Sequence, residues 1–499
     1  MQRLQICKSF SQSGQKYFKK LSNCQILTMS GLQSISSAGV SRSSDLETKC
    51  CPIQHRWVFC ILAFLAIFIS SIMFSLPSLL HETKTISLKN INGSDFCSIN
   101  HNFTLKVSVL KDPNSATKYI TLFAIHWGYL LSCFPAGIFS DQFGGKYIMT
   151  LSLLFSSFWC LVTPAIAVLS KNRPGWMAGT QFFRGFFKGI VFPTIMSLLA
   201  QWAPDTERTK MVCLVYGSYF LSQEISTEIQ KFLPEKQLYF LFGSIGVVFC
   251  FCWHLFLYPT PEDHPSITPN ELKFLDENTE DRPVKGRKNI PWAGILTSGP
   301  FWAVLILQIG LSWNWVVYFY AYDIYLPGVL KFEDYENTIW RIPFYLCFGF
   351  ALIYGFISDW FIKEKLLSVT ILRKIAALIG NSGSAFSLLF VIFGGCHSNA
   401  VMIHFTVGLC FQALFYLSCR VNHLDLTSNF AGTLMGMTRI FDRISEYVVD
   451  SELSYLLTIE SSLRQWAGLF WFTFGLNLLS TCVFLILASG IRQGWNYVK

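Results

Sequence analysis

The feature that most constrains this chain is a series of long apolar blocks separated by polar segments. Residues 57–80 and 466–490 are two of them, and each exceeds the roughly 20 residues that a helix needs to cross a bilayer. A backbone in lipid must satisfy its own hydrogen bonds, so these blocks are expected to be helices. Only 14% of the residues are charged, whereas soluble domains carry about 25%. The sequence therefore predicts an all-α, multi-pass integral membrane protein.

Twelve membrane-spanning helices are predicted, in two lobes of six. The expected spans are 57–80, 118–140, 147–170, 175–203, 210–233, 236–258, 300–328, 338–362, 372–395, 400–420, 429–452 and 466–490. The fifth and the eleventh are less apolar than the others. The long polar segment between the sixth and seventh spans divides the chain into its two halves.

These spans define five parts of the chain. Residues 1–55, rich in Ser, Gln and Lys, are expected to be a disordered cytosolic tail, and residues 56–258 to be the N-terminal lobe. Residues 259–299 form the expected cytosolic loop between the lobes. Residues 300–490 form the C-terminal lobe, and residues 491–499 a short cytosolic tail. We expect a monomer whose surroundings are the lipid bilayer.

Charge and glycosylation patterns predict the orientation. The loop 81–117 contains the acceptor patterns that begin at Asn92 and Asn102, opposite a basic tail, so this loop is expected to be luminal or extracellular. The Lys and Arg residues lie mainly in the tail and in alternate loops, as the positive-inside rule expects. The net charge of +9 therefore does not indicate a nucleic-acid partner. Cys97 and Cys396 fall in predicted outer loops, where a disulfide between them is one option, and the cysteines show no metal-ligand spacing.

A short motif occurs at the same place in both halves. After the second span the chain reads Gly137-Ile-Phe-Ser-Asp141-Gln-Phe-Gly144-Gly145-Lys146, and after the eighth it reads Gly355-Phe-Ile-Ser-Asp359, followed by Arg373-Lys374. Glycine lets two helices approach closely, and an aspartate at a helix end can pair with a cation or with the N-terminus of a neighbouring helix. An ordinary charged turn is the alternative, which the second copy argues against. We predict a gate that forms on one side of the membrane, with residues Gly137, Asp141, Lys146, Asp359 and Arg373.

This motif resembles the loop motif of the major facilitator superfamily, whose halves are related repeats. Further segments resemble the anion:cation symporter family that includes sialin, vesicular glutamate transporters and sodium-dependent phosphate cotransporters. The most specific of these segments are Pro261-Glu262-Asp263-His264-Pro265 and Asn422-His423-Leu424-Asp425. Weaker matches include Trp127-Gly128-Tyr129, Trp202-Ala203-Pro204, Asn314-Trp315 and Phe430-Ala431-Gly432, so the resemblance covers residues 57–490.

The resemblance implies a major facilitator fold and the transport of organic or inorganic anions coupled to protons or sodium. It also implies that basic residues within spans receive the anion. This sequence departs from the family at those places. Ser71 and Gln181 align with two family arginines, Lys188 with an acidic residue and Arg439 with an asparagine. The fold is therefore expected to carry over, but the identity of the substrate and of the coupling ion is not.

The fourth span carries Gln181, Arg184 and Lys188 within one narrow arc of a helix. Cations facing lipid would cost a few kcal/mol each, so these residues should face a cavity. They are expected to bind the substrate together with Arg439. The alternative is that the cations pair with carboxylates of a neighbouring helix.

The fifth span supplies such carboxylates, Glu224 and Glu228, at helical spacing. One of them is the expected carrier of a coupling proton, because desolvation disfavours the charged carboxylate. No cofactor is expected beyond this co-transported proton or sodium ion. Pairing with Lys188 or with Lys231 is the alternative role.

The eleventh and seventh spans also carry polar side chains. On the eleventh a charged stripe must line a pathway or pair along the helix at spacings of three and four residues, and it consists of Arg439, Asp442, Arg443, Glu446 and Asp450. On the seventh, Asn314 and Tyr318 lie on one side, where they suit substrate binding or helix packing.

We therefore expect a secondary active transporter of small anions, either inorganic phosphate or organic carboxylates, that works by alternating access. No catalytic residues are expected, because polytopic enzymes need His with Asn or Asp, or paired Asp residues, at membrane depth, and the one mid-span histidine of note, His126, is not expected to form such a site. A relative that has lost transport and acts as a receptor or regulator is the alternative. The expected location is the plasma membrane or a vesicular or lysosomal membrane.

Overall fold

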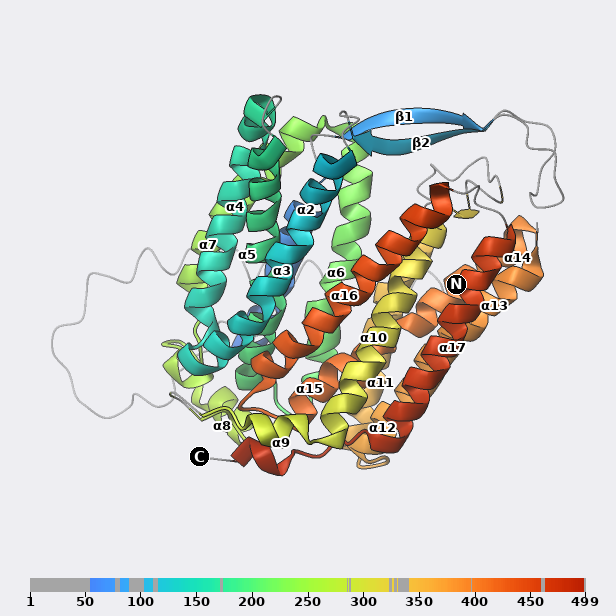
Figure 1. Cartoon of the computed structure of the whole chain (residues 1–499). Coiled ribbons are helices and arrows are strands. Elements are labelled where there is room, and N and C mark those ends of the chain that lie inside the picture. Colours follow the sequence, from blue (N-terminus) through green and yellow to red (C-terminus); the bar gives the residue numbers. More distant parts are fainter. Residues whose placement is uncertain are drawn as a thin grey trace, which may run out of the picture. The chain divides into compact units, whose positions relative to one another are not determined.

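The computed structural model describes residues 54–76, 81–88, 103–110, 115–170, 174–284, 286, 289–322, 325–326, 330, 341–395, 397–458 and 463–497. The chain divides into two compact units, Met1–Trp57 and Val58–Lys499. Almost all of the predicted cytosolic tail lies outside the described residues, and the fold below is that of the second unit. Its helices lie side by side along most of their length (Figure 1).

Six long helices form the N-terminal lobe, and each overlaps one predicted span. They are α2 (His55–Ser75), α3 (Ser115–Phe143), α4 (Gly145–Leu169), α5 (Pro174–Trp202), α6 (Arg208–Phe232) and α7 (Glu235–Phe256). α5 packs against α3 and α4, and α4 also packs against α7. α6 instead packs against α11 of the other lobe, so it lies at the boundary between the lobes.

The C-terminal lobe also follows its six predicted spans, with more breaks in the helices. Its elements are α10 (Gly299–Tyr320), α11 (Ile342–Lys363), α12 (Val369–Ala377), η5 (Leu378–Ser382), α13 (Gly383–Gly394), α14 (Ser398–Gln412), η6 (Tyr416–Arg420), α15 (Val421–Leu426), α16 (Ala431–Thr458), α17 (Leu463–Leu487) and η7 (Gly494–Tyr497). The turns η5 and η6 are π-helical, a geometry that often occurs at functional sites.

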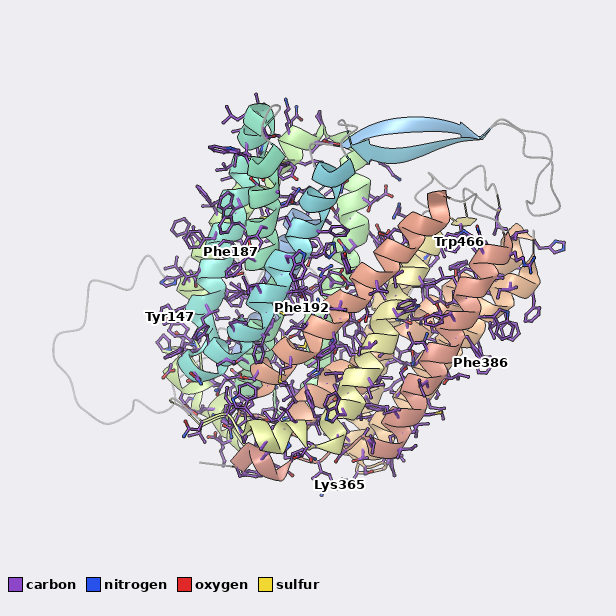
Figure 2. All side chains as sticks on the ribbon, viewed as in Figure 1. Tyr147, Phe187, Phe192, Lys365, Phe386 and Trp466 are labelled. Carbon is purple, nitrogen blue, oxygen red and sulfur yellow. The ribbon has the colours of Figure 1, made fainter. Side chains whose placement is uncertain are left out.

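Nine helices in the described part of the chain are long and apolar enough to cross a membrane. Two further predicted spans, α6 and α16, are long but carry several charged residues, and α14 has only 15 residues. Large apolar side chains such as Tyr147 and Phe386 are exposed on the outside of the bundle (Figure 2). An exposed apolar surface of this kind suits contact with lipid.

Two predicted loops contain secondary structure. In the outer loop, β1 (His81–Leu88) and β2 (Phe103–Leu110) pair as an antiparallel hairpin, in agreement with their content of Thr, Ile and Val. The segment between the lobes contains α8 (Pro269–Glu277) and α9 (Trp292–Leu296). The hairpin lies at one end of the bundle and α8 and α9 at the other (Figure 1). We call the end with α8 and α9 the inner end.

Candidate functional site

Asp141 joins α3 of the N-terminal lobe to α16 of the C-terminal lobe at the inner end. Its carboxylate accepts hydrogen bonds from the backbone N–H groups of Gly432 at 3.0 Å and Thr433 at 2.6 Å, and from the Thr433 hydroxyl at 2.8 Å. These N–H groups belong to the first turn of α16, where they lack partners within the helix. A Cβ added to Gly137 would lie 2.7 Å from the carbonyl carbon of Gly432. The two helices therefore touch through their backbones, and Asp141 caps a helix of the opposite lobe.

The second copy of the motif makes the equivalent contact in the opposite direction. Asp359 of α11 accepts hydrogen bonds from the backbone N–H groups of Thr209 at 3.1 Å and Lys210 at 2.8 Å. These are the second and third residues of α6, in the N-terminal lobe. Gly355 again lies one turn before the aspartate, and a Cβ added there would lie 3.2 Å from the side chain of Cys213. The repeat thus produces two cross-lobe helix caps.

The two cations of the predicted gate differ in their contacts. Arg373 is buried, and its Nε donates to Oδ2 of Asp425 at 2.8 Å. Oδ1 of the same carboxylate lies 3.4 Å from Nη1 of Arg208, at the start of α6, so Asp425 links the lobes through Arg208. Lys146 instead lies over the ring of Tyr258, with Nζ 4.8 Å from the ring centre. Lys146 and Tyr258 both belong to the N-terminal lobe.

Arg184, in the fourth predicted span, binds the end of the first. Its Nη2 donates to the backbone carbonyls of Met73 at 2.7 Å and Leu76 at 3.3 Å, and its Nη1 donates to Gln181 at 2.8 Å and to the hydroxyl of Tyr239 at 2.9 Å. Carbonyls at a helix C-terminus carry partial negative charge and need donors. Arg184 therefore caps α2, with Gln181 as its neighbour, and its contacts in the described residues do not include the carboxylate pairs of the alternative role.

Lys188, one turn further along α5, is 3% exposed. Its Nζ donates to the hydroxyls of Ser71 at 2.6 Å and Ser70 at 3.2 Å, and lies 5.1 Å from the centre of the Phe192 ring. Among the side chains that the structure describes, no carboxylate forms an ion pair with this ammonium group. The alternative role as a partner of Glu224 is therefore not realised for Lys188.

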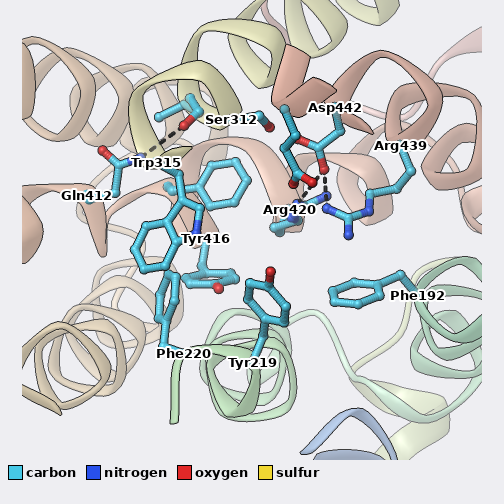
Figure 3. A pocket seen from close by; sticks show the side chains of 13 residues that line it. Phe192, Tyr219, Phe220, Ser312, Trp315, Gln412, Tyr416, Arg420, Arg439 and Asp442 are labelled. Carbon is cyan, nitrogen blue, oxygen red and sulfur yellow. Dashed lines mark hydrogen bonds and ion pairs between the residues drawn. The ribbon is translucent and has the colours of Figure 1, made fainter. Parts of the chain in front are cut away.

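A cavity of about 40 Å³ lies between the lobes, beside Phe192 (Figure 3). Six aromatic side chains form much of its wall. The complete lining is Phe192, Tyr219, Phe220, Leu311, Ser312, Trp315, Gln412, Phe415, Tyr416, Arg420, Arg439, Asp442 and Glu446. Both lobes contribute, so any relative movement of the lobes changes the shape of this cavity.

The charged stripe of α16 both pairs along the helix and lines the cavity. Arg439 forms an ion pair with Asp442, and Arg443 forms one with Glu446. Arg420 of η6 lies 3.3 Å from Asp442, so this one carboxylate faces two guanidinium groups. The three arginines exceed the two carboxylates by one formal positive charge. The side chain of Asp450, the last member of the stripe, is outside the described residues.

Arg439 also contacts the N-terminal lobe. Its Nε donates to the hydroxyl of Tyr129 at 3.0 Å, and its guanidinium carbon lies 4.2 Å from the centre of the Phe192 ring. Phe192 therefore lies against two cations, Arg439 and Lys188. The arrangement brings together two of the predicted substrate-binding residues around one ring of the cavity wall.

Asn314 and Tyr318 face the interior of the C-terminal lobe. The amide of Asn314 donates to Ser384 at 2.8 Å and to Gln412 at 2.7 Å, and the hydroxyl of Tyr318 donates to the carbonyl of Ser384 at 2.8 Å. Neither residue lines the cavity. Gln412 does, so Asn314 can influence the cavity only through this neighbour.

Glu224 and Glu228 lie at the outer end of the contact between α6 and α11. Nη1 of Arg341, the residue before α11, lies 2.9 Å from Oε2 of Glu224, and its Nε lies 3.6 Å from Oε1 of Glu228. Glu228 also pairs with Lys231 at 2.9 Å, one of its two expected partners. Neither glutamate lines the cavity.

The sequence interpretation did not single out Arg420, Arg341 or the aromatic wall. Arg420 had a usable signal, since it is the one Lys or Arg residue of its predicted span, 400–420. The aromatic residues had none, because such residues occur throughout the chain. The glycosylation sites and the cysteines of the outer loops lie outside the described residues. Glycosylation of Asn92 and Asn102, and the option of a disulfide between Cys97 and Cys396, therefore stay predictions.

Comparisons with known proteins agree with this architecture. The sequence model of the Major Facilitator Superfamily matches residues 58–445. A Drosophila ananassae protein named "Putative inorganic phosphate cotransporter" is 26% identical over 394 residues, which are 77% of this chain and 81% of that protein. Human sialin is 24% identical and covers 74% of each chain. The chloroplastic ascorbate transporter of Arabidopsis thaliana is 28% identical over 76% of this chain and 69% of that protein.

Proposed function

Because this chain belongs to the major facilitator superfamily, we propose that it is a secondary active transporter of small organic anions. Membership of this superfamily makes it a multi-pass membrane transporter rather than an enzyme. The receptor-like alternative finds no support among relatives that are named as transporters of phosphate, ascorbate and glutamate. All three of these named substrates are anions.

The observation that carries the proposal is a charged cluster at the inter-lobe cavity. Arg420, Arg439, Asp442 and Glu446 line the cavity, and Arg443, paired with Glu446, adjoins them and leaves the cluster with one excess positive charge. Guanidinium groups away from bulk water favour an anion, because the anion offsets the cost of removing the cation from water. Arg439 is the central anion-binding residue of the proposed site, since it contacts both lobes.

The wall of the cavity favours an organic anion over inorganic phosphate. Phe192 and Phe220 present ring surface alone, and Tyr219, Trp315 and Tyr416 each add a ring that carries one polar group. Phosphate has no apolar part and would gain nothing from such a surface, whereas a carboxylate attached to an apolar body would bury that body against the rings. Phosphate is the second candidate, supported by the name of the Drosophila relative.

The coupled cation, sodium or a proton, is proposed to meet the carboxylates of the cavity. Asp442 and Glu446 are the acidic residues of the lining in the described chain. Glu224 and Glu228, the carboxylates predicted for coupling, are paired with Arg341 away from the cavity. We therefore assign coupling to the α16 carboxylates and an outer closing contact to Glu224 and Glu228.

Alternating access follows from the contacts between the lobes. The caps made by Asp141 and Asp359 hold the inner ends together, and rocking of one lobe against the other must break them. The proposal places Gly137, Asp141, Asp359 and Arg373 in this gate. We further propose that the protein is a monomer, that it lies in the plasma membrane or in a vesicular or lysosomal membrane, and that Asn92 and Asn102 are glycosylated on the outer or luminal side. Imaging of the tagged protein tests the location, and a glycosidase gel shift tests the glycosylation.

Uptake by the purified protein in liposomes tests the function. Radiolabelled aromatic and aliphatic carboxylates, ascorbate, glutamate and phosphate are supplied under an imposed sodium or proton gradient. We expect gradient-driven uptake of at least one organic anion and a loss of at least about tenfold in Arg439→Gln, equivalent to ~1.4 kcal/mol of binding free energy. Arg439→Lys should keep part of the activity, because it keeps the charge but not the planar geometry. Uptake of phosphate alone would favour the second candidate, and no uptake of any anion would refute the proposal.

A further inference from the structure

The surroundings of Lys188 carry an inference about substrate selection. A buried ammonium group normally needs a counter-charge, because removing it from water costs several kcal/mol. Here the partners in the described residues are the hydroxyls of Ser70 and Ser71 and the face of Phe192. Hydroxyl dipoles and an aromatic ring solvate a cation without neutralising it. In its protonated form this side chain places a positive charge inside the N-terminal lobe, and an anion bound nearby favours that form.

This charge lies close to the proposed anion site. Lys188 Nζ is 5.1 Å from the centre of the Phe192 ring, and the guanidinium carbon of Arg439 is 4.2 Å from the same point. The two cations are therefore no more than 9.3 Å apart, the sum of these distances. Arg439 is paired with Asp442, but Lys188 has no acidic partner among the described side chains. An anion bound to Arg439 is therefore close enough to Lys188 to interact electrostatically with it.

We propose that Lys188 selects the valence of the substrate, so that anions with two negative charges bind in preference to anions with one. The proposal rests on the anion-transport function above and deepens it. The arginines around the cavity exceed its carboxylates by one formal charge, and Lys188 adds a second. A divalent anion matches this excess of two, whereas a monovalent anion leaves one cation uncompensated.

The size of the effect follows from Coulomb's law. At a separation of ~9 Å and an effective dielectric constant of ~20, a unit charge changes the affinity for a monoanion by roughly tenfold or more. The same charge acts twice as strongly, in free energy, on a dianion, so the affinity for the dianion changes by roughly the square of that factor. Removing the charge of Lys188 should therefore reduce the preference for the dianion by about tenfold.

The Lys188 side chain is a positioning group, not a direct ligand, because it does not line the cavity. A structural role would lower the affinity for all anions alike or destabilise the fold. Only a role in valence selection changes the ratio between two ligands that share one body. This ratio is the readout that separates the two roles.

Phthalate and benzoate provide the matched pair, since they share an aromatic ring and differ by one carboxylate. Binding to the purified full chain is followed by quenching of tryptophan fluorescence, because Trp315 lines the cavity, with Trp315→Phe to identify the responding residue. Wild type is compared with Lys188→Gln, which keeps hydrogen bonding to the serines, and with Lys188→Arg, which keeps the charge. Lys273→Gln is the matched control, an exposed lysine on α8.

We expect Lys188→Gln to weaken benzoate binding about tenfold and phthalate binding about a hundredfold, while Lys188→Arg keeps the wild-type ratio within about twofold. Equal losses for both ligands, or an unchanged ratio in a protein that elutes as a single species, would overturn the role of Lys188. Lys188→Met, which keeps the stem without a charge, replaces Lys188→Gln if that variant does not fold. If wild type binds neither these ligands nor any other anion of the uptake panel, the proposed function fails instead.

Discussion

Two of the contacts between the lobes, α3 with α16 and α6 with α11, are built alike at the inner end and differently at the outer end. At the inner end, Asp141 and Asp359 each cap the first turn of the partner helix. At the outer end, α3 and α16 meet through the rings of Phe123 and Tyr447, whose centres are 4.9 Å apart. There α6 and α11 are joined by the ion pair of Glu224 with Arg341.

The difference indicates how a duplicated chain acquires two unequal gates. The inner contacts come from the repeated Gly-x-x-x-Asp segments, so each lobe carries one aspartate for the other. The outer contacts are made by residues that do not belong to these repeated segments. We infer that inner closure is distributed over two equivalent positions, whereas outer closure depends on one buried ion pair. The predictions below test this inequality.

The largest effect is expected at the outer end of α6 and α11. Arg341→Gln leaves Glu224, whose side chain is 1% exposed, without this arginine. Breaking one partner of a buried ion pair typically costs about 3–5 kcal/mol. We expect a marked drop in the melting temperature of the purified protein and a loss of transport at equal surface amount.

Two comparisons sharpen this prediction. Arg341→Gln combined with Glu224→Gln should recover much of the stability, because no charge of the pair is then left buried. Phe123→Leu, at the outer end of the other contact, should cost only about 1 kcal/mol, the value of an aromatic pair. An equal loss in Phe123→Leu and Arg341→Gln would contradict the proposed inequality of the outer ends.

Gly137 and Gly355, the glycines of the two motifs, should differ in how well they tolerate replacement by alanine. In Gly137→Ala the new methyl group meets the backbone of Gly432 and Thr433, at 2.7 and 3.0 Å, and backbone atoms cannot rotate away. Overpacking of this kind costs about 1–3 kcal/mol, and we expect the upper part of this range. In Gly355→Ala the nearest atoms are those of the Cys213 side chain and the Cα of Lys210, all at 3.2 Å, so a few tenths of an ångström of movement suffice. Thermal unfolding and transport of the two variants should rank in this order, and the reverse ranking would refute the argument.

The fold could be predicted well from the sequence, because a backbone in lipid must satisfy its own hydrogen bonds and therefore forms helices. A dozen apolar blocks were enough to place the helices of both lobes. The duplicated motif marked Asp141 and Asp359, which contact the opposite lobe, while their role in a gate stays a prediction. The three spans that charge or length makes atypical, α6, α14 and α16, were also placed, since they lie between clear neighbours. The β-hairpin was not foreseen, because the prediction treated segment 81–117 only as a polar connection.

The candidate site was predicted less well, for a physical reason. Helical periodicity shows which residues share a face, but not which partner that face meets. Arg184 and Lys188 share a face, yet one caps the carbonyl end of α2 and the other contacts two serines. Glu224 looked available to Lys188 from its spacing, but it pairs with Arg341 of the other lobe. Contacts between helices distant in sequence decide these roles.

A smaller effect is expected from the caps themselves. Asp141→Asn and Asp359→Asn keep the shape of the side chain and remove its charge, which weakens the interaction with the helix N-terminus by about 1–2 kcal/mol. We expect transport to slow by roughly tenfold with near-normal surface expression, because a conformational step is affected rather than folding. Since the two caps are equivalent, the two variants should slow transport by similar factors. Unchanged turnover in both would refute a gating role, and a large difference between them would refute the equivalence.

The smallest effect is expected at Lys146, which follows the first motif and was predicted to belong to the gate. Its Nζ lies over the Tyr258 ring at 4.8 Å, and both residues lie on the same side of the contact between the lobes. Exposed cation–π contacts are worth about 0.5–1 kcal/mol, and this contact need not break when the lobes separate. Lys146→Gln should therefore lower the melting temperature slightly and change the transport rate less than about threefold. Tyr258→Leu is the matched control, because it removes the same contact and should have the same small effect. If Lys146→Gln slows transport as much as Asp141→Asn while Tyr258→Leu does not, the lysine acts across the lobes in another conformation, and the gate includes a residue that this structure keeps apart from it.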